Sequence, residues 1–166
     1  AEKDFLPLPD EDAACDMYLQ TCERLRESGF EHYEISNFAR PGFQSRHNNK
    51  YWLCGEYLGL GPSAHSFLGG KRFFYKSDLT SFLKSEPPVF DCEGGTKEEF
   101  IMLALRLSRG LVFEEYESRF GEKFSGEKRR QAEKLQEYGL LKIDEKKISL
   151  TEKGFLLSNS IIAKLC

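Results

Sequence analysis

The 166-residue sequence has no CxxC pair among its five cysteines, and no apolar run in it approaches the roughly 18 residues that a membrane-spanning helix needs. We therefore expect no membrane span. An odd number of cysteines without paired spacing favours free thiols in a reducing, cytoplasmic setting over a disulfide framework. The chain opens on the charged stretch Ala1 to Asp4, so we expect no secretory signal, and its start without Met suggests an excised piece of a longer protein.

A strong charge of either sign is also missing. The formal net charge is −3, which argues against bulk affinity for nucleic acid because binding to phosphates needs a clustered basic surface. Hydrophobic residues make up 40% and charged residues 31%, a balance typical of a globular protein. Aromatic residues are plentiful at 13%, and taken without any motif they favour core filling over a pocket for a flat ligand.

The common catalytic signatures are absent as well. The sequence has no GxSxG, no HExxH and no phosphate-binding loop, and none of its cysteines has the basic neighbours that mark a nucleophile. Three histidines remain as candidate acid–base groups or metal ligands: His32, His47 and His65. A lone histidine on a predicted strand is usually a surface residue or a satisfied polar one, so we assign His32 no role.

The first half of the chain predicts one helix followed by short strands. A helix of about 19 residues stops at Gly29, and its apolar face has helical spacing, with Cys15, Tyr18, Leu19, Cys22 and Leu25. We then expect a strand at 30–35, a loop at 36–45, a short helix at 46–54, a strand–turn–strand unit at 57–68, a strand at 71–76 and a helix from 77 to about 84. The strands are expected to pack against the first helix and to leave at least one edge unpaired.

A linker is expected around Pro87-Pro88 and Gly94-Gly95, which divides the chain into units at 1–90 and 96–166. In the second unit we expect a helix after the capping box Thr96–Glu99, a short helix up to Gly121, and a helix from Ser125 to Gly139. The third of these helices has Ala132, Leu135 and Tyr138 on one face. A hairpin at 141–150 and a last helix after Thr151 follow. This order is that of a winged-helix-like unit. One core is expected to contain Leu103, Leu107, Leu135, Leu141, Ile148, Leu150 and Leu157.

Two stretches hold residues that could carry chemistry. Between His47 and Trp52 lie an imidazole, two amides, a phenol and an indole, which could stack on a flat ring and offer one metal ligand. The alternative is a structural knuckle in which Trp52 fills the core, and the residues alone favour that alternative. His65 follows Gly59 and Gly61, where glycine allows a ligand to approach the backbone closely; the alternative there is a tight bend.

Three motifs, taken together, make this sequence similar to a known family. The run HYEISNFARPGFQSRHNNKYW, followed by EYLGLGPSAHSFLGG, resembles the oxygen-independent coproporphyrinogen III oxidase family of radical SAM enzymes, and specifically its heme chaperone branch. That branch has YEISNFA, HNxxYW and GLGxxAHS segments in this order, which here lie at 33–39, 47–52 and 59–66. The pattern from 98 to 157 is also similar to the tail domain of the family, so the resemblance covers nearly the whole chain.

The resemblance implies an α+β fold made of the carboxyl-terminal edge of a partial α/β radical SAM barrel and a winged-helix-like tail. Family members hold a [4Fe-4S] cluster in a CxxxCxxC triad, whose open iron binds S-adenosylmethionine, and this sequence has no such triad. The cluster and S-adenosylmethionine are therefore expected in the full-length protein alone. The chain by itself is expected to have no catalytic residue and no radical chemistry.

The same resemblance implies the site residues. Heme binding in the chaperone branch is associated with HNxxYW, which carries over to His47, Asn48, Tyr51 and Trp52, with His47 as the candidate ligand of the heme iron. A weaker carry-over places S-adenosylmethionine near Gly61, Ala64 and His65, where the oxidase and chaperone patterns differ. The expected partners are heme, client hemoproteins that receive it, and a second copy of the chain paired through an open strand edge.

Two other functions stay open. The first is oxidative decarboxylation by a coproporphyrinogen III oxidase in porphyrin biosynthesis, which needs the missing amino-terminal half. The second is a winged-helix module that binds nucleic acid. Residues 126–147 carry seven basic and five acidic side chains, and this small excess is typical of a solvated helix face.

Overall fold

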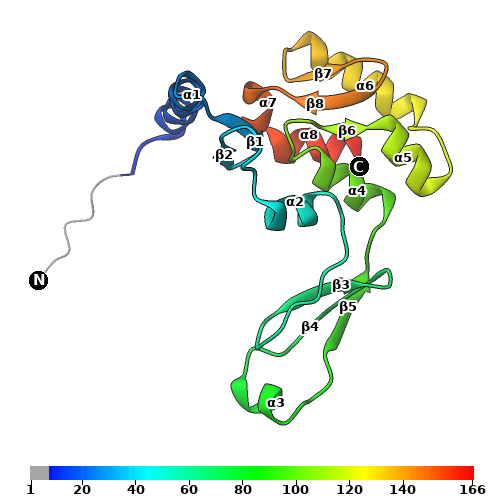
Figure 1. Cartoon of the computed structure of the whole chain (residues 1–166). Helices are drawn as coiled ribbons and strands as arrows, with labels where there is room; N and C mark the ends of the chain where they lie inside the picture. Colours follow the sequence, from blue (N-terminus) through cyan, green and yellow to red (C-terminus); the bar gives the residue numbers. More distant parts are fainter. Residues whose placement is uncertain (1–7) are drawn as a thin grey trace, which may run out of the picture.

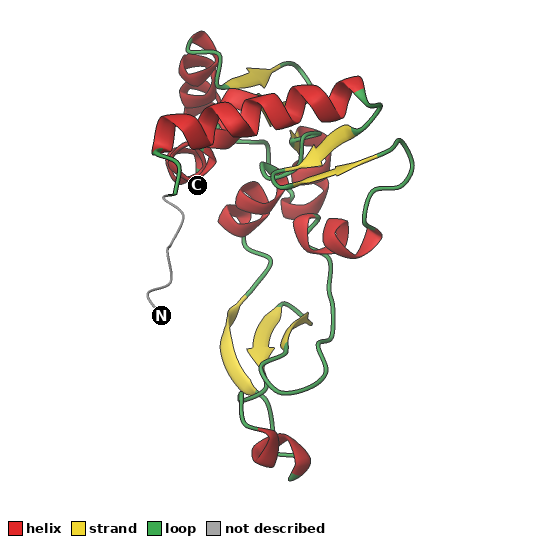
Figure 2. Ribbon diagram, turned by 90° about the vertical axis from the view of Figure 1, so that its left-hand side faces the viewer, coloured by secondary structure: helices red, strands yellow, loops and turns green. Residues whose placement is uncertain are grey.

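The computed structural model describes residues 8–166, which form a mixed α+β fold with three small antiparallel sheets. Figure 1 shows a helical body at one end of the molecule and a narrow sheet that extends from it toward the other end, and the turned view in Figure 2 shows the same separation. The sheets of this range have two, three and three strands, and none closes into a barrel. None of its helices is long and apolar enough to cross a membrane.

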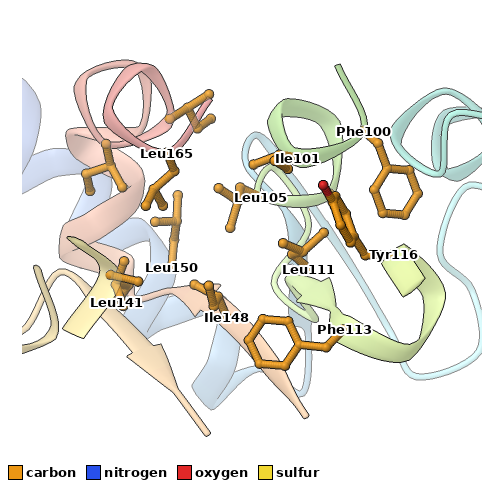
Figure 3. Packing of buried hydrophobic residues seen from close by; sticks show 14 of the residues in the cluster. Phe100, Ile101, Leu105, Leu111, Phe113, Tyr116, Leu141, Ile148, Leu150 and Leu165 are labelled. Carbon is orange, nitrogen blue, oxygen red and sulfur yellow. The ribbon is translucent and has the colours of Figure 1, made fainter. Parts of the chain in front are cut away.

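The body consists of helices around a three-stranded sheet in which β8 lies between β6 and β7. Its elements are α4 (Lys97–Ala104), β6 (Leu111–Val112), α5 (Phe113–Phe120), α6 (Gly126–Glu137), β7 (Leu141–Ile143), β8 (Lys147–Leu150), α7 (Glu152–Leu156) and α8 (Ser158–Leu165). Figure 3 shows how their apolar side chains meet, among them Leu105, Leu111, Leu141, Ile148 and Leu165, which are all but fully buried. Burial of these side chains is the main force that holds the body together.

Side-chain caps fix where several of the helices begin, and those at Thr96 and Thr151 were expected from the sequence. Asp10, Ser45, Asp78, Thr96 and Thr151 each accept a hydrogen bond from a backbone N–H in the first turn of the helix that follows. The expected short helix that stops at Gly121 and the expected hairpin at 141–150 are also confirmed. Local capping and turn chemistry was therefore a good guide to these boundaries.

Two helix predictions for the body are wrong, and one strand was missed. The last helix is two helices, because the chain breaks at Leu157, and this residue is half exposed instead of sharing the core. Tyr138 follows the end of α6 and is 77% exposed, so it does not share the buried face of Ala132. The strand β6 was not expected, and it forms because Leu111 and Val112 pair with Ile148 and Lys147 far along the chain.

The amino-terminal elements pack on the body through α1 (Glu11–Glu27), which contacts α7 and β1 (Glu31–Glu34). The loop expected at 36–45 is partly wrong, since β2 (Asn37–Ala39) pairs with β1 in a tight hairpin. The buried Glu34 carboxylate accepts a hydrogen bond from the Asn37 amide across this turn, which reverses the chain within four residues. Backbone bonds from Ile35 to Arg106 and from Ser108 to Tyr33 then join the hairpin to the body.

His32 lies on β1 in an aromatic setting. Its ring stacks on Phe38 at 4.4 Å and lies 5.0 Å from the ring of Phe155 on α7, while its buried Nε2 has no hydrogen-bond partner among residues 8–166. Burial lowers the pKa of His32 below its ordinary value of 6.5, although the nearby Glu34 and Glu152 act in the opposite direction. The expectation of a surface or satisfied histidine is wrong, because the tight hairpin turns this ring toward α7.

The arm is the segment that carries β3 (His65–Leu68), β4 (Lys71–Phe74), α3 (Leu79–Leu83) and β5 (Val89–Glu93). The strand at 71–76 and the helix at 77–84 are confirmed, whereas the first strand expected near Tyr57 is a single bridge to Phe67. The expected linker contains β5, which pairs with β4 through Phe73–Phe90 and Phe74–Val89. The arm sheet lies at the opposite end of the molecule from α1 and does not pack against it as expected (Figure 1).

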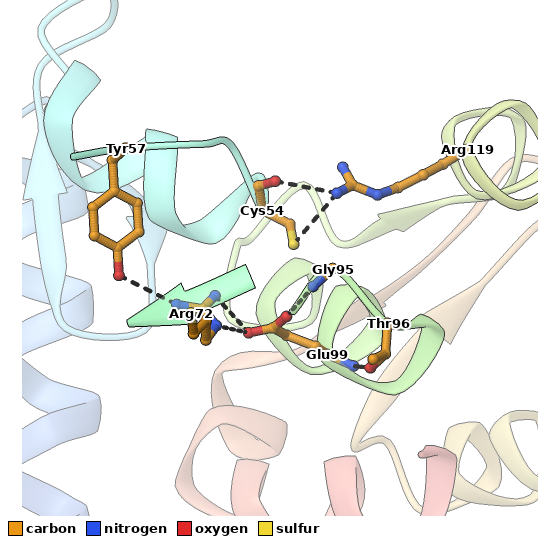
Figure 4. Close-up of polar contacts among 7 residues, drawn as sticks. All are labelled: Cys54, Tyr57, Arg72, Gly95, Thr96, Glu99 and Arg119. Carbon is orange, nitrogen blue, oxygen red and sulfur yellow. Dashed lines mark hydrogen bonds and ion pairs between the residues drawn. The ribbon is translucent and has the colours of Figure 1, made fainter. Parts of the chain in front are cut away.

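A half-buried ion pair joins the arm to the body. Arg72 on β4 donates from Nε to Glu99 Oε1 on α4 over 2.7 Å, and Glu99 Oε2 accepts the Gly95 N–H over 2.5 Å, as Figure 4 shows. The guanidinium of Arg72 also lies 4.8 Å from the ring centre of Phe67, which belongs to the core cluster. One carboxylate therefore fixes both the strand β4 and the start of α4.

Replacing Glu99 with Gln tests this joint. Gln keeps the size of the side chain but removes the charge that Arg72 and the Gly95 N–H face, so we expect the free energy of unfolding to fall by about 1–3 kcal/mol in urea denaturation. Glu86→Gln is the matched control, because Glu86 pairs with Lys76 through side chains that are 40% and 54% exposed. The control should lose less than about 1 kcal/mol, and equal losses would contradict a special role for Glu99.

His32 predicts a dependence of stability on pH. In the unfolded chain this imidazole takes up a proton near pH 6.5, whereas in the folded protein its pKa is lower, so the unfolded state binds more protons as the pH falls below 6.5. The free energy of unfolding should therefore decrease from pH 7.5 to pH 5.5. His32→Phe keeps a ring against Phe38 and should flatten this slope in urea titrations at several pH values, and an unchanged slope would show that His32 does not cause it.

Candidate functional site

The predicted motif His47–Trp52 lies on the short helix α2 (Arg46–Trp52), as the sequence indicates. Ser45 begins the helix, since its hydroxyl accepts the Asn48 N–H over 3.1 Å. His47 is exposed on the first turn, whereas Asn48, Tyr51 and Trp52 are each half buried. The helix therefore presents its imidazole to solvent and uses its aromatic residues to contact the rest of the protein.

His47 and Tyr51 contact each other one helical turn apart. Tyr51 Oη and His47 Nε2 lie 3.1 Å apart, within hydrogen-bond distance, and the two rings meet edge to face at 4.9 Å with an angle of 87°. The spacing of four residues places both side chains on one face of α2. The other ring nitrogen, Nδ1, makes no hydrogen bond within the part of the chain that the structure describes.

Tyr51 is held from its other side by the base of the arm. Its ring lies 4.4 Å from that of Tyr57 at an angle of 78°, and the Tyr57 hydroxyl accepts a hydrogen bond from Arg72 Nη1 over 3.2 Å (Figure 4). Arg72 in turn donates a hydrogen bond to Glu99 on α4, where this series of side-chain contacts ends. Side chains from α2, the arm and α4 thus form one continuous contact path that ends at the exposed imidazole.

Tyr57 and Arg72 carry no sequence signal of a role at the site, and Glu99 was expected only as part of a capping box. Glu99 stands in the S/T-x-x-E pattern of a capping box, and that pattern predicts a local hydrogen bond back toward Thr96. Its backbone N–H does bond to the Thr96 hydroxyl, but its carboxylate reaches Arg72, which lies 27 positions earlier. A pattern read within one helix turn could not reveal a partner at that separation.

The end of α2 is fixed by Cys54. This residue has a positive φ of 52°, is 2% exposed, and accepts hydrogen bonds from Arg119 Nη2 at its carbonyl oxygen over 3.3 Å and at its sulfur over 3.6 Å. Burial raises the pKa of the Cys54 thiol, although the positive charge of Arg119 acts against this. A buried thiol with a raised pKa is a poor nucleophile, so Cys54 has a structural role here.

Two buried polar atoms near α2 have no partner in the described part of the chain. They are the indole Nε1 of Trp52 and the amide Oδ1 of Asn49. Asn49 borders a cavity of about 550 Å³ together with Tyr33, Gln44 and Arg109, among other residues. The Arg106 guanidinium lies 6.0 Å from the ring centre of Trp52. The ring of Trp52 thus lies between the surface and the core.

The second predicted set, Gly61, Ala64 and His65, belongs to the arm. Gly59 allows the turn there, because a side chain at this position would place its Cβ 2.2 Å from the His65 carbonyl oxygen, and the Gly59 N–H donates to the buried Ser66 hydroxyl over 3.0 Å. The exposed ring of His65 stacks on Phe74 at 5.2 Å. The contacts of His65 therefore stay within the arm, while those of His47 lie on α2, and Tyr57 with its bridge to Phe67 links the two segments.

Within residues 8–166 no group of three or more His, Cys, Asp or Glu side chains could hold a metal ion. A single exposed imidazole does not need such a group when the metal already sits in a macrocycle, since a porphyrin supplies the in-plane nitrogens and the protein supplies an axial ligand. The donor set on α2 therefore fits an iron porphyrin better than a free cation. His47 is the nitrogen donor of that set.

Known proteins are similar to this chain over most of its length. The family described as HemN C-terminal domain matches residues 97–157. The chain is 36% identical to heme chaperone HemW of Lactococcus lactis over 96% of its own length and 44% of the relative, and 32% identical to the bovine mitochondrial radical S-adenosyl methionine domain-containing protein 1 over 96% of its length and 40% of the relative. Each of these proteins is more than twice as long as the aligned chain.

A solved structure shows the same fold. It is that of coproporphyrinogen III oxidase (HemN) from Escherichia coli, described as a radical SAM enzyme, with a TM-score of 0.68, an identity of 21%, and coverage of 95% of this chain and 42% of that one. The chain spans less than half the length of the relatives that it matches. From the tail domain and the relatives aligned over nearly the whole chain, we conclude that residues 97–157 are a HemN C-terminal domain and that the chain is a relative of the HemN-like radical SAM proteins.

Proposed function

We propose that this chain is the heme-handling part of a heme chaperone. The observation that carries the proposal is the exposed imidazole of His47 on α2, beside Tyr51 and Trp52, in a chain whose relatives bear the name heme chaperone over 96% of its length. Heme is then cargo that the protein passes on. Its iron supplies the open coordination position, and the residues of α2 supply the ligand and the surroundings.

His47 is the residue that would bind the iron, because an imidazole nitrogen is an ordinary axial ligand of heme. Trp52 is our candidate to border the macrocycle, since its half-buried ring ends the helix that carries His47. Asn48 lies beside His47 in the first turn and Tyr51 contacts it. This assignment gives each residue of the motif a place around one ligand.

We further propose that the [4Fe-4S] cluster and S-adenosylmethionine belong to the part of the whole protein outside this chain. Gly61, Ala64 and His65 are our candidates for contact with S-adenosylmethionine from the arm. The glycine turn supports this, because no atom lies within 4 Å of the place that a Cβ would take at Gly61. The turn itself is held by the Ala64 N–H, which donates to the Gly61 carbonyl, and by the Ala64 carbonyl, which accepts the Tyr75 N–H. We assign no catalytic side chain to the chain itself, and client hemoproteins are the proposed acceptors of heme.

The finer architecture is also a proposal. The order of α4, α5, α6 and the β7–β8 hairpin supports a winged-helix-like unit at 96–166, and the arm and amino-terminal elements at 1–90 support the last elements of a barrel. The open edge of β5, the outer strand of the arm sheet, supports self-association. All five cysteines are free thiols, which supports a reducing compartment such as the cytoplasm.

A winged-helix unit raises the alternative of nucleic-acid binding, and the contacts of α6 count against it. Arg129 faces Glu133 at 3.6 Å and donates to the Asp144 carbonyl, and Lys128 donates to the Cys166 carbonyl over 2.6 Å. Cations that are already engaged within the protein give a poor surface for phosphates. The oxidase alternative rests on a fold likeness at 21% identity, which does not bear on activity.

Titration with ferric heme tests the proposal. We expect weak, substoichiometric uptake with a Soret shift in the wild-type chain, and loss of that shift or an altered spectrum in His47→Ala because the axial nitrogen is gone. Lys50→Ala is the matched control, since Lys50 is exposed on the same helix. Identical spectra and affinities for the wild type and His47→Ala would show that His47 is not the ligand.

A further inference from the structure

The contact between Tyr51 and His47 has a chemical consequence for any ligand of the imidazole. The hydroxyl meets Nε2, which is the nitrogen at the outer end of the ring and the one that most easily reaches a metal. A neutral imidazole has one N–H donor and one lone pair, so a hydrogen bond at one nitrogen decides which of them the other nitrogen carries. The direction of this hydrogen bond therefore decides which nitrogen of His47 has a lone pair and which carries the proton.

The acidity of a phenol favours Tyr51 as the donor in this pair, because a tyrosine hydroxyl is a good donor and an imidazole lone pair is a good acceptor. With the phenol as donor, the Tyr51 O–H points at Nε2 and the ring carries its proton on Nδ1. In this arrangement neither nitrogen is free, because Nε2 accepts from Tyr51 and Nδ1 bears hydrogen.

We propose that the Tyr51 hydroxyl caps His47 Nε2 and competes with heme iron for that lone pair. This inference rests on the proposed function, since it concerns how the same site holds its cargo. When iron binds, the O–H···N hydrogen bond breaks, the Nε2 lone pair forms the coordinate bond, the Nδ1 proton stays in place, and the Tyr51 hydroxyl turns to water. When heme leaves, the hydrogen bond forms again.

The structure keeps the cap in place when no ligand is bound. Tyr51 follows His47 by four residues on one helix face, and its ring is packed edge to face against Tyr57 at 4.4 Å. Arg72 holds the Tyr57 hydroxyl over 3.2 Å and is itself paired with Glu99. The capping ring is thus fixed by contacts that reach into the body, and its hydroxyl needs no large movement to return to Nε2.

The cap makes a prediction opposite in sign to that of a residue that borders the macrocycle. Tyr51→Phe keeps both ring contacts and removes only the hydroxyl, so iron then displaces a mobile water from His47 instead of an intramolecular hydrogen bond that the helix holds in place. Heme affinity should rise about threefold to tenfold, which corresponds to about 0.6–1.4 kcal/mol, and heme should dissociate correspondingly more slowly. Tyr138→Phe is the matched control, because Tyr138 is 77% exposed after α6, and its heme affinity should equal that of the wild type.

Nitrogen-15 NMR of the imidazoles in the heme-free protein tests the cap without heme. We expect His47 to carry its proton on Nδ1 in the wild type, with Nε2 as a hydrogen-bond acceptor, and to shift toward the Nε2–H tautomer in Tyr51→Phe. An Nε2–H tautomer in the wild type would overturn the cap whatever the titrations give.

The two sets of results separate the cap from the proposed function. If His47→Ala loses the Soret shift while Tyr51→Phe binds heme no more tightly than wild type, the cap as a competitor is wrong and heme binding by His47 stands. If His47→Ala binds heme like the wild type, the ligand assignment fails, and competition with iron fails with it. Tighter binding in Tyr51→Phe together with the expected tautomer supports the proposal.

Discussion

The ion pair between Arg72 and Glu99 is the contact on which the arrangement of the arm, α2 and the body depends. The arm has few ways to stay aligned, because its three short strands leave much apolar surface exposed, including Leu60 and Phe90. At its base the guanidinium contacts Glu99, Tyr57 and the face of Phe67 together. Removal of such a group from water is costly, and the pair offsets that cost by satisfying several donors at once.

Most helices of this protein could be predicted from the sequence because their signals are local. Asp78 and Thr96 cap helices through side chains within one turn, and Gly121 ends α5 with a φ of 69°. The elements that were missed are short strands, such as β2 and β5, whose pairing needs a partner elsewhere. A strand of three to five residues has no strong preference of its own, so its partner decides whether it forms.

In the candidate site, too, the features with local sequence signals were predicted and those that depend on distant contacts were not. The short helix that presents His47 was predicted, as was the glycine turn near Gly59, and the structure adds the Ser45 cap that begins the helix. The path from Tyr51 through Tyr57 to Arg72 was not, because its members come from separate elements and their contacts are set by the position of the arm. A sequence motif could thus name the ligand candidate, but the residues that orient it appear once the arm and α4 are placed together.

The arrangement on α2 fits a protein that gives up what it binds. A tightly held heme calls for a buried pocket and a histidine whose second nitrogen is oriented by an acceptor that strengthens it as a ligand. Here the His47 imidazole is exposed on a helix of seven residues. The Tyr51 hydroxyl contacts its Nε2, the nitrogen that would bind iron, and not the second nitrogen Nδ1. An internal hydrogen bond that replaces the iron bond lowers the cost of release, because the nitrogen is never left without a partner. If His47 binds heme as we propose, its exposure and the competing hydroxyl at Nε2 favour exchange of heme over storage.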